Sequence, residues 1–420
     1  MKRRFLKGLI LLGTTLLLSL PLTPAEAFIA SIKGLGIGAT GVAYPQDAEA
    51  GAYNPAGITW VGSRADVGIS VIRSDGLTIA TGFQNPAQNG NFNPYVKHYV
   101  YNPHFGVVKQ IYHCDKHLAI GLVVYNRAEA FSKYGQPFPN LGTSHLRLTY
   151  IQEIVATQVA FEICPGHSIG LSLDLLFQRL KINGLENFEA DTTAPGFVTG
   201  NGASTGEGVG LTVGYLGEFG GCFRIGLSYT PEAEISRFNR YKGFIADKGR
   251  LNSPQRIAGG ISLKVLPCLN WAFDIVHVAY NQIPALHNPL AIPGNLGAAN
   301  GAAFGWRDRI FFRTGFDYQV NDNINVRIGY RHARAPMPRE LEAGAANLLT
   351  METTQDFITT GFTYRIDCKK EFSFYYAHGF HHNVENRIPL GLNPPNFLPG
   401  ARVKYGQSKD AFGFSFGLYY

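Results

Sequence analysis

The chain has 420 residues, a formal net charge of +7, and charged side chains at only 16% of its positions. A surplus this small and dispersed does not make a nucleic-acid-binding surface, so no nucleic-acid partner is expected. Glycine (49), phenylalanine (29) and tyrosine (21) are abundant. Beyond the N-terminal region no stretch approaches the roughly 18 continuous apolar residues of a spanning helix. These features favour an exported protein rich in β-strands.

Residues 1–27 have the three regions of a secretory signal peptide. A basic start is followed by an apolar run over residues 9–20 and by a cleavage site at Ala25-Glu26-Ala27. The apolar run is about a dozen residues long, well short of the roughly 20 that a membrane anchor needs. We therefore expect cleavage after Ala27.

The rest of the chain alternates between large apolar and small or polar side chains. At the C-terminal end, glycine, serine and tyrosine separate the residues of one face, which are Phe412, Phe414, Phe416, Leu418 and Tyr420. Many such segments are longer than a typical strand of a β-sandwich, which has about five or six residues. An apolar face toward lipid and a polar face toward a lumen is typical of a transmembrane β-barrel.

We predict fourteen strands joined by hairpins, an even number as in closed single-chain barrels. The predicted strands are residues 64–74, 104–112, 117–131, 146–163, 167–182, 208–216, 223–238, 253–266, 270–283, 306–320, 323–332, 354–366, 371–384 and 409–420. Short connections alternate with long ones, which predicts periplasmic turns and extracellular loops. The predicted fold is all-β: a 14-stranded antiparallel barrel over residues 64–420 in the outer membrane, with both termini in the periplasm.

Residues 28–63 show neither the period of a strand nor that of a helix. Their glycine and alanine residues permit close backbone packing, and Asn54-Pro55 marks a turn. Side chains alone do not fill a barrel of this size. We therefore expect this segment to lie inside the lumen as a plug, or hatch.

This segment resembles the hatch of the FadL/TodX family, outer-membrane transporters of long-chain fatty acids and other hydrophobic compounds. The resemblance rests on Gly34-Leu35-Gly36, Ala43-Tyr44, Asp47-Ala48, Asn54-Pro55-Ala56 and Ala65-Asp66-Val67-Gly68-Ile69. It implies that Asn54, Pro55 and Ala56 act in gating. It also implies an opening in the wall at a kink in the third strand, through which substrate leaves sideways. It implies no cofactor, no metal and no enzymatic chemistry.

The third predicted strand and two arginines supply further candidate residues. The third strand loses its apolar alternation around Tyr125, Asn126 and Arg127, where we place the kink, because polar side chains facing lipid need a gap or bulge. The family resemblance suggests Arg179 and Arg307 as carboxylate ligands. Arg307 has the parity of luminal side chains. Arg179 shares the parity of outward leucines, so it faces the lumen only if a bulge intervenes near residues 175–176, and otherwise it extends to the outer rim.

The five cysteines all lie at or next to short turns: Cys114, Cys164, Cys222, Cys268 and Cys368. The periplasm is oxidising, and an odd number leaves at least one thiol without an internal partner. Three outcomes are open: disulfides with other envelope proteins, reduced thiols, and internal pairs. Internal pairs require bent turns, since neighbouring turns are roughly 10 Å apart.

No metal site is predicted from His378, His381 and His382, because His381 lies on the opposite face and no carboxylate or thiol converges with them. The terminal aromatic Tyr420 resembles the signal read by the outer-membrane assembly machinery, an expected partner together with outer-membrane lipid. The leading function is passive, plug-gated transport of long-chain fatty acids or similar hydrophobic molecules. The alternatives are a diffusion porin and a structural or adhesive envelope protein cross-linked through the turn cysteines.

Overall fold

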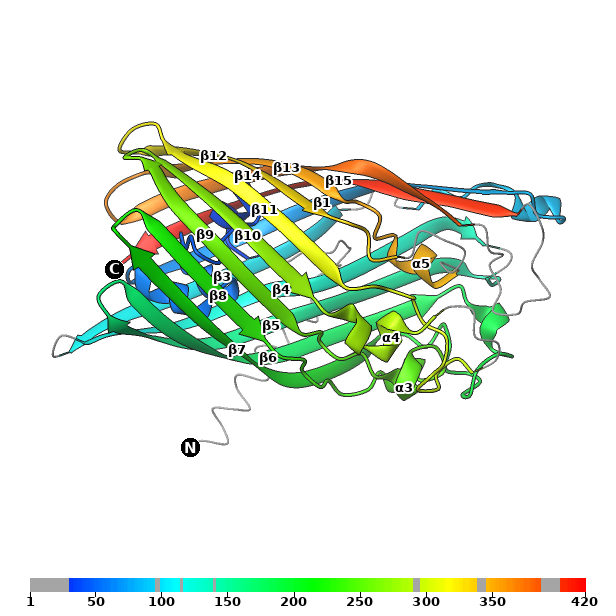
Figure 1. Cartoon of the computed structure of the whole chain (residues 1–420). Helices are drawn as coiled ribbons and strands as arrows, with labels where there is room; N and C mark the ends of the chain where they lie inside the picture. Colours follow the sequence, from blue (N-terminus) through cyan, green and yellow to red (C-terminus); the bar gives the residue numbers. More distant parts are fainter. Residues whose placement is uncertain are drawn as a thin grey trace.

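The computed structural model describes residues 30–94, 99–113, 116–138, 141–289, 295–337, 345–386 and 401–420. Fourteen long strands form one antiparallel sheet that closes where β1 pairs with β15 (Figure 1). The strands are β1 (Arg64–Thr81), β3 (Tyr99–His113), β4 (Lys116–Pro137), β5 (His145–Cys164), β6 (His167–Asn183), β7 (Ser204–Phe219), β8 (Phe223–Thr230), β9 (Arg256–Leu266), β10 (Leu269–Val278), β11 (Arg309–Gln319), β12 (Ile324–Ala333), β13 (Asp356–Arg365), β14 (Lys370–Asn386) and β15 (Arg402–Tyr419). A two-residue strand, β2 (Gly90–Asn91), pairs with the end of β1.

All fourteen predicted strands are present, and the differences lie at their ends. The first strand continues to Thr81 because it pairs with β15 along its whole length, a long-range contact that local alternation does not reveal. The seventh strand, β8, ends at Thr230 and not at residue 238. The next residue is Pro231, which has no N–H to donate to a strand ladder.

The two faces of the strands follow the predicted alternation. In β15 the side chains of Phe412, Phe414, Phe416 and Leu418 are 39–47% exposed, whereas the glycine and serine residues between them are buried. Exposed large apolar side chains recur on the outer face of most other strands, so lipid covers the wall. No helix within the described ranges is long and apolar enough to cross a membrane.

The short turns and the C-terminus lie at one end of the barrel, and the long loops lie at the other (Figure 1). The loop end carries α3 (Ala246–Gly249), α4 (Pro284–His287), α5 (Ala345–Thr350) and the 3-10 turns η3 (Pro86–Gln88), η4 (Glu186–Phe188), η5 (Asn239–Tyr241) and η6 (Tyr280–Gln282). Apolar side chains from these loops and from the adjoining strand ends form the largest buried cluster, which caps the lumen.

The N-terminal segment, residues 30–63, lies inside the barrel near the turn end, in blue in Figure 1. It contains α2 (Ile32–Gly36), η1 (Ala50–Ala52) and η2 (Pro55–Trp60), and almost all of its residues are buried. The helix α2 packs on β13 and β14, whereas η2 packs on β5, β6 and β7. Because these strands lie far apart around the barrel, the segment spans the lumen.

The described cysteines lie in turns or, for Cys164, at the end of β5, at the same end of the barrel as the N-terminal segment. Cys164, Cys222 and Cys368 are exposed, Cys268 is half-buried, and none of the four is in a disulfide. Cys114 lies outside the described residues. The three exposed cysteines are therefore accessible from the turn end.

Candidate functional site

Asn54 joins the N-terminal segment to the barrel wall. Its side chain is fully buried, and its Nδ2 donates hydrogen bonds to the carbonyl oxygens of Val42 and, on β7, Tyr215, both at 2.8 Å. Its Oδ1 accepts from the backbone N–H of Ala56 at 3.1 Å, which caps η2. A Cβ atom at Gly214 would lie 2.0 Å from this Oδ1, so only glycine allows the contact.

Buried charged side chains on the wall hold other parts of the same segment. Asp274 of β10 accepts hydrogen bonds from the backbone N–H groups of Gly41 (2.7 Å) and Val42 (3.1 Å). Nearer the turns, Lys33 pairs with Glu371. Within the segment, burial, together with the nearby carboxylates of Asp66 and Glu49, raises the pKa of Asp47 to about 7. The segment is thus fixed by polar contacts that a change of charge or ligand could alter.

The strand β4 carries a β-bulge at Arg127. Its pairing with β5 runs from Asn126 opposite Glu153 directly to Ala128 opposite Gln152, which leaves Arg127 as an extra residue. The bulge lies at one of the three residues where the third strand is predicted to kink.

Beyond the bulge, β4 lies on the luminal side of the wall. Asn126, Glu129 and Phe131 have the parity of outward residues, yet they are only 9%, 3% and 1% exposed. Phe131 belongs to the same buried cluster as Ala80 of β1. These side chains are covered because β1 and β3 pass outside them.

The wall between β3 and β4 is interrupted at this level. The backbone ladder between the two strands ends with Phe105 opposite Val124, and β3 pairs only with β1 from residue 104 to its N-terminal end. Pro103, two residues beyond the last pair, has no N–H to extend the ladder. An isolated bridge between Pro94 and Tyr134 is the next backbone contact in the described part of this region.

Side-chain hydrogen bonds connect β3 to β4 where the ladder is missing. Asn126 Nδ2 donates to Asn102 Oδ1 at 2.7 Å and to Glu129 Oε2 at 3.1 Å, and Asn102 Nδ2 donates to Glu129 Oε1 at 3.4 Å. A few side-chain contacts are more easily broken than a ladder of backbone hydrogen bonds. At this place the wall is therefore held by side-chain contacts in place of a backbone ladder.

The bulge turns Arg127 into the lumen. Its Nη2 donates to Asp174 Oδ2 at 2.7 Å and to the Tyr125 hydroxyl at 2.6 Å. Asp174 also accepts hydrogen bonds from Ser172 and Thr212. The charge of Arg127 is therefore paired inside the barrel and kept away from lipid.

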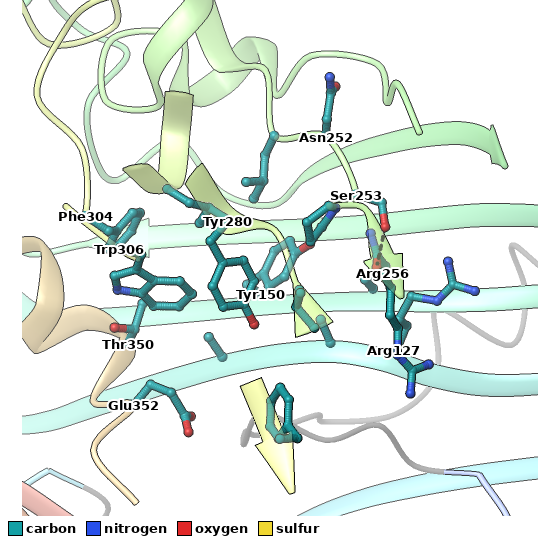
Figure 2. Close-up of a pocket in the computed structure, with 18 of the residues that line it drawn as sticks. Arg127, Tyr150, Asn252, Ser253, Arg256, Tyr280, Phe304, Trp306, Thr350 and Glu352 are labelled. Atoms are coloured by element: carbon teal, nitrogen blue, oxygen red, sulfur yellow. Dashed lines mark hydrogen bonds between the residues drawn. The ribbon is translucent and has the colours of Figure 1, made fainter. Parts of the chain in front are cut away.

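A pocket lined by strand residues and by the loop cluster lies inside the barrel, with about 1290 Å³ of space between protein atoms, part of it open to solvent. Figure 2 shows Tyr150, Tyr280 and Trp306 among its apolar walls, and Arg127 and Arg256 at the other side. The guanidinium-bearing residues of the lining are Arg127, Arg256, Arg313 and Arg331. Mostly apolar walls with a few convergent cations suit a hydrophobic molecule that carries one anionic group.

The two arginines predicted as carboxylate ligands do not line this pocket. Arg307 precedes β11, which begins at Arg309, so strand parity does not apply to it, and its side chain is exposed. Arg179 stays on the outward face with Leu173, because β6 pairs without a register shift through residues 175–176. The luminal orientation on which these predictions depended is absent, since one extended the strand alternation beyond the strand and the other needed a bulge that β6 lacks.

The pocket arginines that the prediction missed could have been found from parity. Arg313 and Arg331 alternate with the outward residues Phe312 and Tyr330 inside true strands, so both point inward. Glu352, which also lines the pocket, lies in a loop where no periodic pattern applies.

A closed barrel with a lumen-filling segment and an interrupted wall is the architecture of an outer-membrane channel. The chain matches the family model "Outer membrane protein transport protein (OMPP1/FadL/TodX)" over residues 22–389, and it belongs to that family. The members are transport channels for hydrophobic compounds, not enzymes, and this protein is placed accordingly in the outer membrane.

Several solved structures share the fold. A Pseudomonas aeruginosa FadL homologue is 14% identical with a TM-score of 0.68, covering 94% of this chain and 99% of its own. The P. putida toluene transporter TodX is 13% identical with a TM-score of 0.68, covering 93% and 98%. The Ralstonia pickettii toluene transporter TbuX is 15% identical with a TM-score of 0.60, covering 92% and 97%. A search of curated protein sequences gave no significant match.

Proposed function

We propose that this protein carries long-chain fatty acids, or similar hydrophobic molecules with an anionic head, passively through the outer membrane. The observation that carries the proposal is the position of Arg127 and Ala128, which line the pocket and also form the bulge beside the interrupted wall. A molecule in this pocket therefore has a short lateral route between β3 and β4 into the outer leaflet.

The lining chemistry favours an acid over a neutral aromatic compound. TodX is described as a toluene transporter, and toluene would use only the apolar walls of such a pocket. Arg256, Arg313 and Arg331 place positive charge at the pocket, which attracts an anionic head and not a neutral ring. A carboxylate can accept two parallel hydrogen bonds from one guanidinium.

In this proposal, residues 28–63 gate the lumen once the signal peptide, residues 1–27, has been removed. Asn54, Pro55 and Ala56 form the turn that holds the segment against the wall. The short turns and both mature termini face the periplasm. The channel needs no cofactor and no energy source, because it only lets a solute move down its gradient.

Uptake tests the proposal directly. Cells that lack their own fatty-acid channel should take up labelled oleate when they express this protein, and the purified protein should conduct ions poorly in a planar bilayer. A large, steady single-channel current without fatty-acid uptake would favour the diffusion porin instead.

Replacing Arg331 by alanine should weaken binding of a long-chain acid more than that of its methyl ester. The expected difference is about 1.5–3 kcal/mol, the size of a charge-assisted hydrogen bond. Ligand binding to purified barrel, measured by fluorescence displacement, checks this. Arg307→Ala is the matched control, because its exposed guanidinium lies outside the pocket and its loss should change neither affinity. Equal weakening of the acid and the ester in Arg331→Ala would argue against a carboxylate role.

We also propose that exposed turn cysteines form disulfides with other envelope proteins. Cys164, Cys222 and Cys368 are exposed at the turn end, where a periplasmic thiol can reach them. Envelopes prepared with a thiol-blocking agent and run without reductant should contain bands above the monomer mass that reductant removes. A single monomer band, unchanged by reductant, would leave reduced thiols or internal pairs as the answer.

A further inference from the structure

The described end of the connection between β12 and β13, residues 345–355, lies inside the barrel. Its helix α5 packs on β4 and β5, which lie across the lumen from β12 and β13. Asn347, Leu348, Leu349 and Met351 are fully buried. The Tyr134 hydroxyl of β4 donates a hydrogen bond to the Leu348 carbonyl at 2.9 Å. This segment therefore touches the strand that carries the bulge.

A buried carboxylate, that of Glu352, follows the helix α5 by two residues. Glu352 accepts from Arg309 Nη1 at 3.1 Å and from Lys409 Nζ at 2.9 Å, and all three side chains are nearly fully buried. Burial alone would raise its pKa, but Lys409 and Arg309 hold the pKa of Glu352 below its ordinary value, so the group stays ionised. Glu352 also lines the ligand pocket, where Figure 2 shows it below Thr350.

Residues 348–352 thus reproduce the chemistry of the proposed ligand. Leu348, Leu349 and Met351 form an apolar body in the luminal cluster, and the ionised carboxylate of Glu352 follows it. We infer that this segment is an internal competitor, whose carboxylate occupies a cationic site on Arg309 and Lys409, beside the pocket residue Arg331, that the ligand's carboxylate takes when the segment withdraws. This inference rests on the proposed function.

The energetics favour exchange over simple release. Removing one partner of a buried ion pair is strongly unfavourable because the other charge remains unpaired, whereas one carboxylate replacing another keeps Arg309 and Lys409 paired. The segment also holds Met351 at φ +50°, a left-handed conformation that disfavours a residue with a side chain. Withdrawal relaxes that conformation and frees Tyr134, which links ligand binding to the strand beside the wall interruption.

Glu352→Gln tests the competition, because it keeps the shape of the side chain and removes its charge. Purified Glu352→Gln should bind oleate about tenfold or more tightly than wild type, and bind methyl oleate with unchanged affinity. Glu234→Gln is the control, since the Glu234 side chain is 83% exposed on a loop and should change neither value. An unchanged oleate affinity in Glu352→Gln would overturn the competition.

Cysteine labelling tests withdrawal with Glu352 in place, so it does not depend on the folding of that variant. In a cysteine-free background, Leu349→Cys should be protected from a maleimide reagent without ligand and labelled when oleate, but not methyl oleate, is present. Lys248→Cys, exposed on α3, should be labelled throughout. If wild type binds oleate but Leu349→Cys stays protected from the reagent with oleate present, the competition inference is wrong and the proposed function is unaffected. If wild type binds neither acid nor ester, the proposed function fails.

Discussion

Replacing Asn54 by alanine is expected to lower oleate uptake about tenfold while the barrel stays folded. The substitution removes two buried hydrogen bonds to the carbonyl groups of Val42 and Tyr215 and the cap of η2, each worth on the order of 1 kcal/mol. The strand ladder does not include Asn54, so its loss should loosen the segment and not the barrel. Uptake by intact cells, and the heat-dependent shift of folded barrel on electrophoresis, measure the two effects separately.

The chain contains a matched control for this experiment. Asn85-Pro86-Ala87 has the same three residues, and Asn85 caps η3 through the same hydrogen bond to the N–H two residues on, at 3.0 Å. All three residues of this second copy are exposed in a loop. Asn85→Ala should therefore leave uptake unchanged. A loss of folded barrel equal to the loss of uptake in Asn54→Ala would contradict the gating role.

The two copies of this motif illustrate what the sequence can predict. The letters Asn-Pro-Ala specify a capped turn, because the amide side chain and the proline act locally. They do not specify that one turn touches β7 and the other lies on the surface. The surrounding glycine and alanine residues and the absence of strand periodicity placed the first copy inside the barrel.

Periodicity predicted the strands well because each strand has one face in lipid and one in the lumen, as in β15. It also pointed to the place of the bulge, since the apolar alternation of the third strand stops around Asn126 and Arg127. It failed for Arg307, where the strand had not yet begun. It could not predict Glu352, because a loop that crosses the lumen meets β11 and β15 through long-range contacts that leave no local pattern.

The bulge at Arg127 yields the sharpest test of lateral release. Deletion of Arg127 should leave the register of β4 with β5 intact. Asn126 already pairs with Glu153, and Ala128 pairs with the adjacent residue, Gln152. Without the extra residue, β4 should no longer bend to the luminal side of β3. Asn126 and Glu129 would then face lipid, which is unfavourable for polar groups. The variant therefore combines deletion of Arg127 with Asn126→Leu and Glu129→Leu.

This variant should fold as a barrel and take up no more oleate than cells lacking the protein, because a straight β4 fills the interruption beside β3. Arg127→Ala is the control: it removes the charge and the pair with Asp174 but keeps the bulge, so it should retain most of the uptake. Oleate binding to the purified deletion variant distinguishes a closed exit from a damaged pocket, since binding should persist while uptake is lost. Uptake at the wild-type level by a folded deletion variant would mean that substrate leaves by another route, such as past the N-terminal segment into the periplasm.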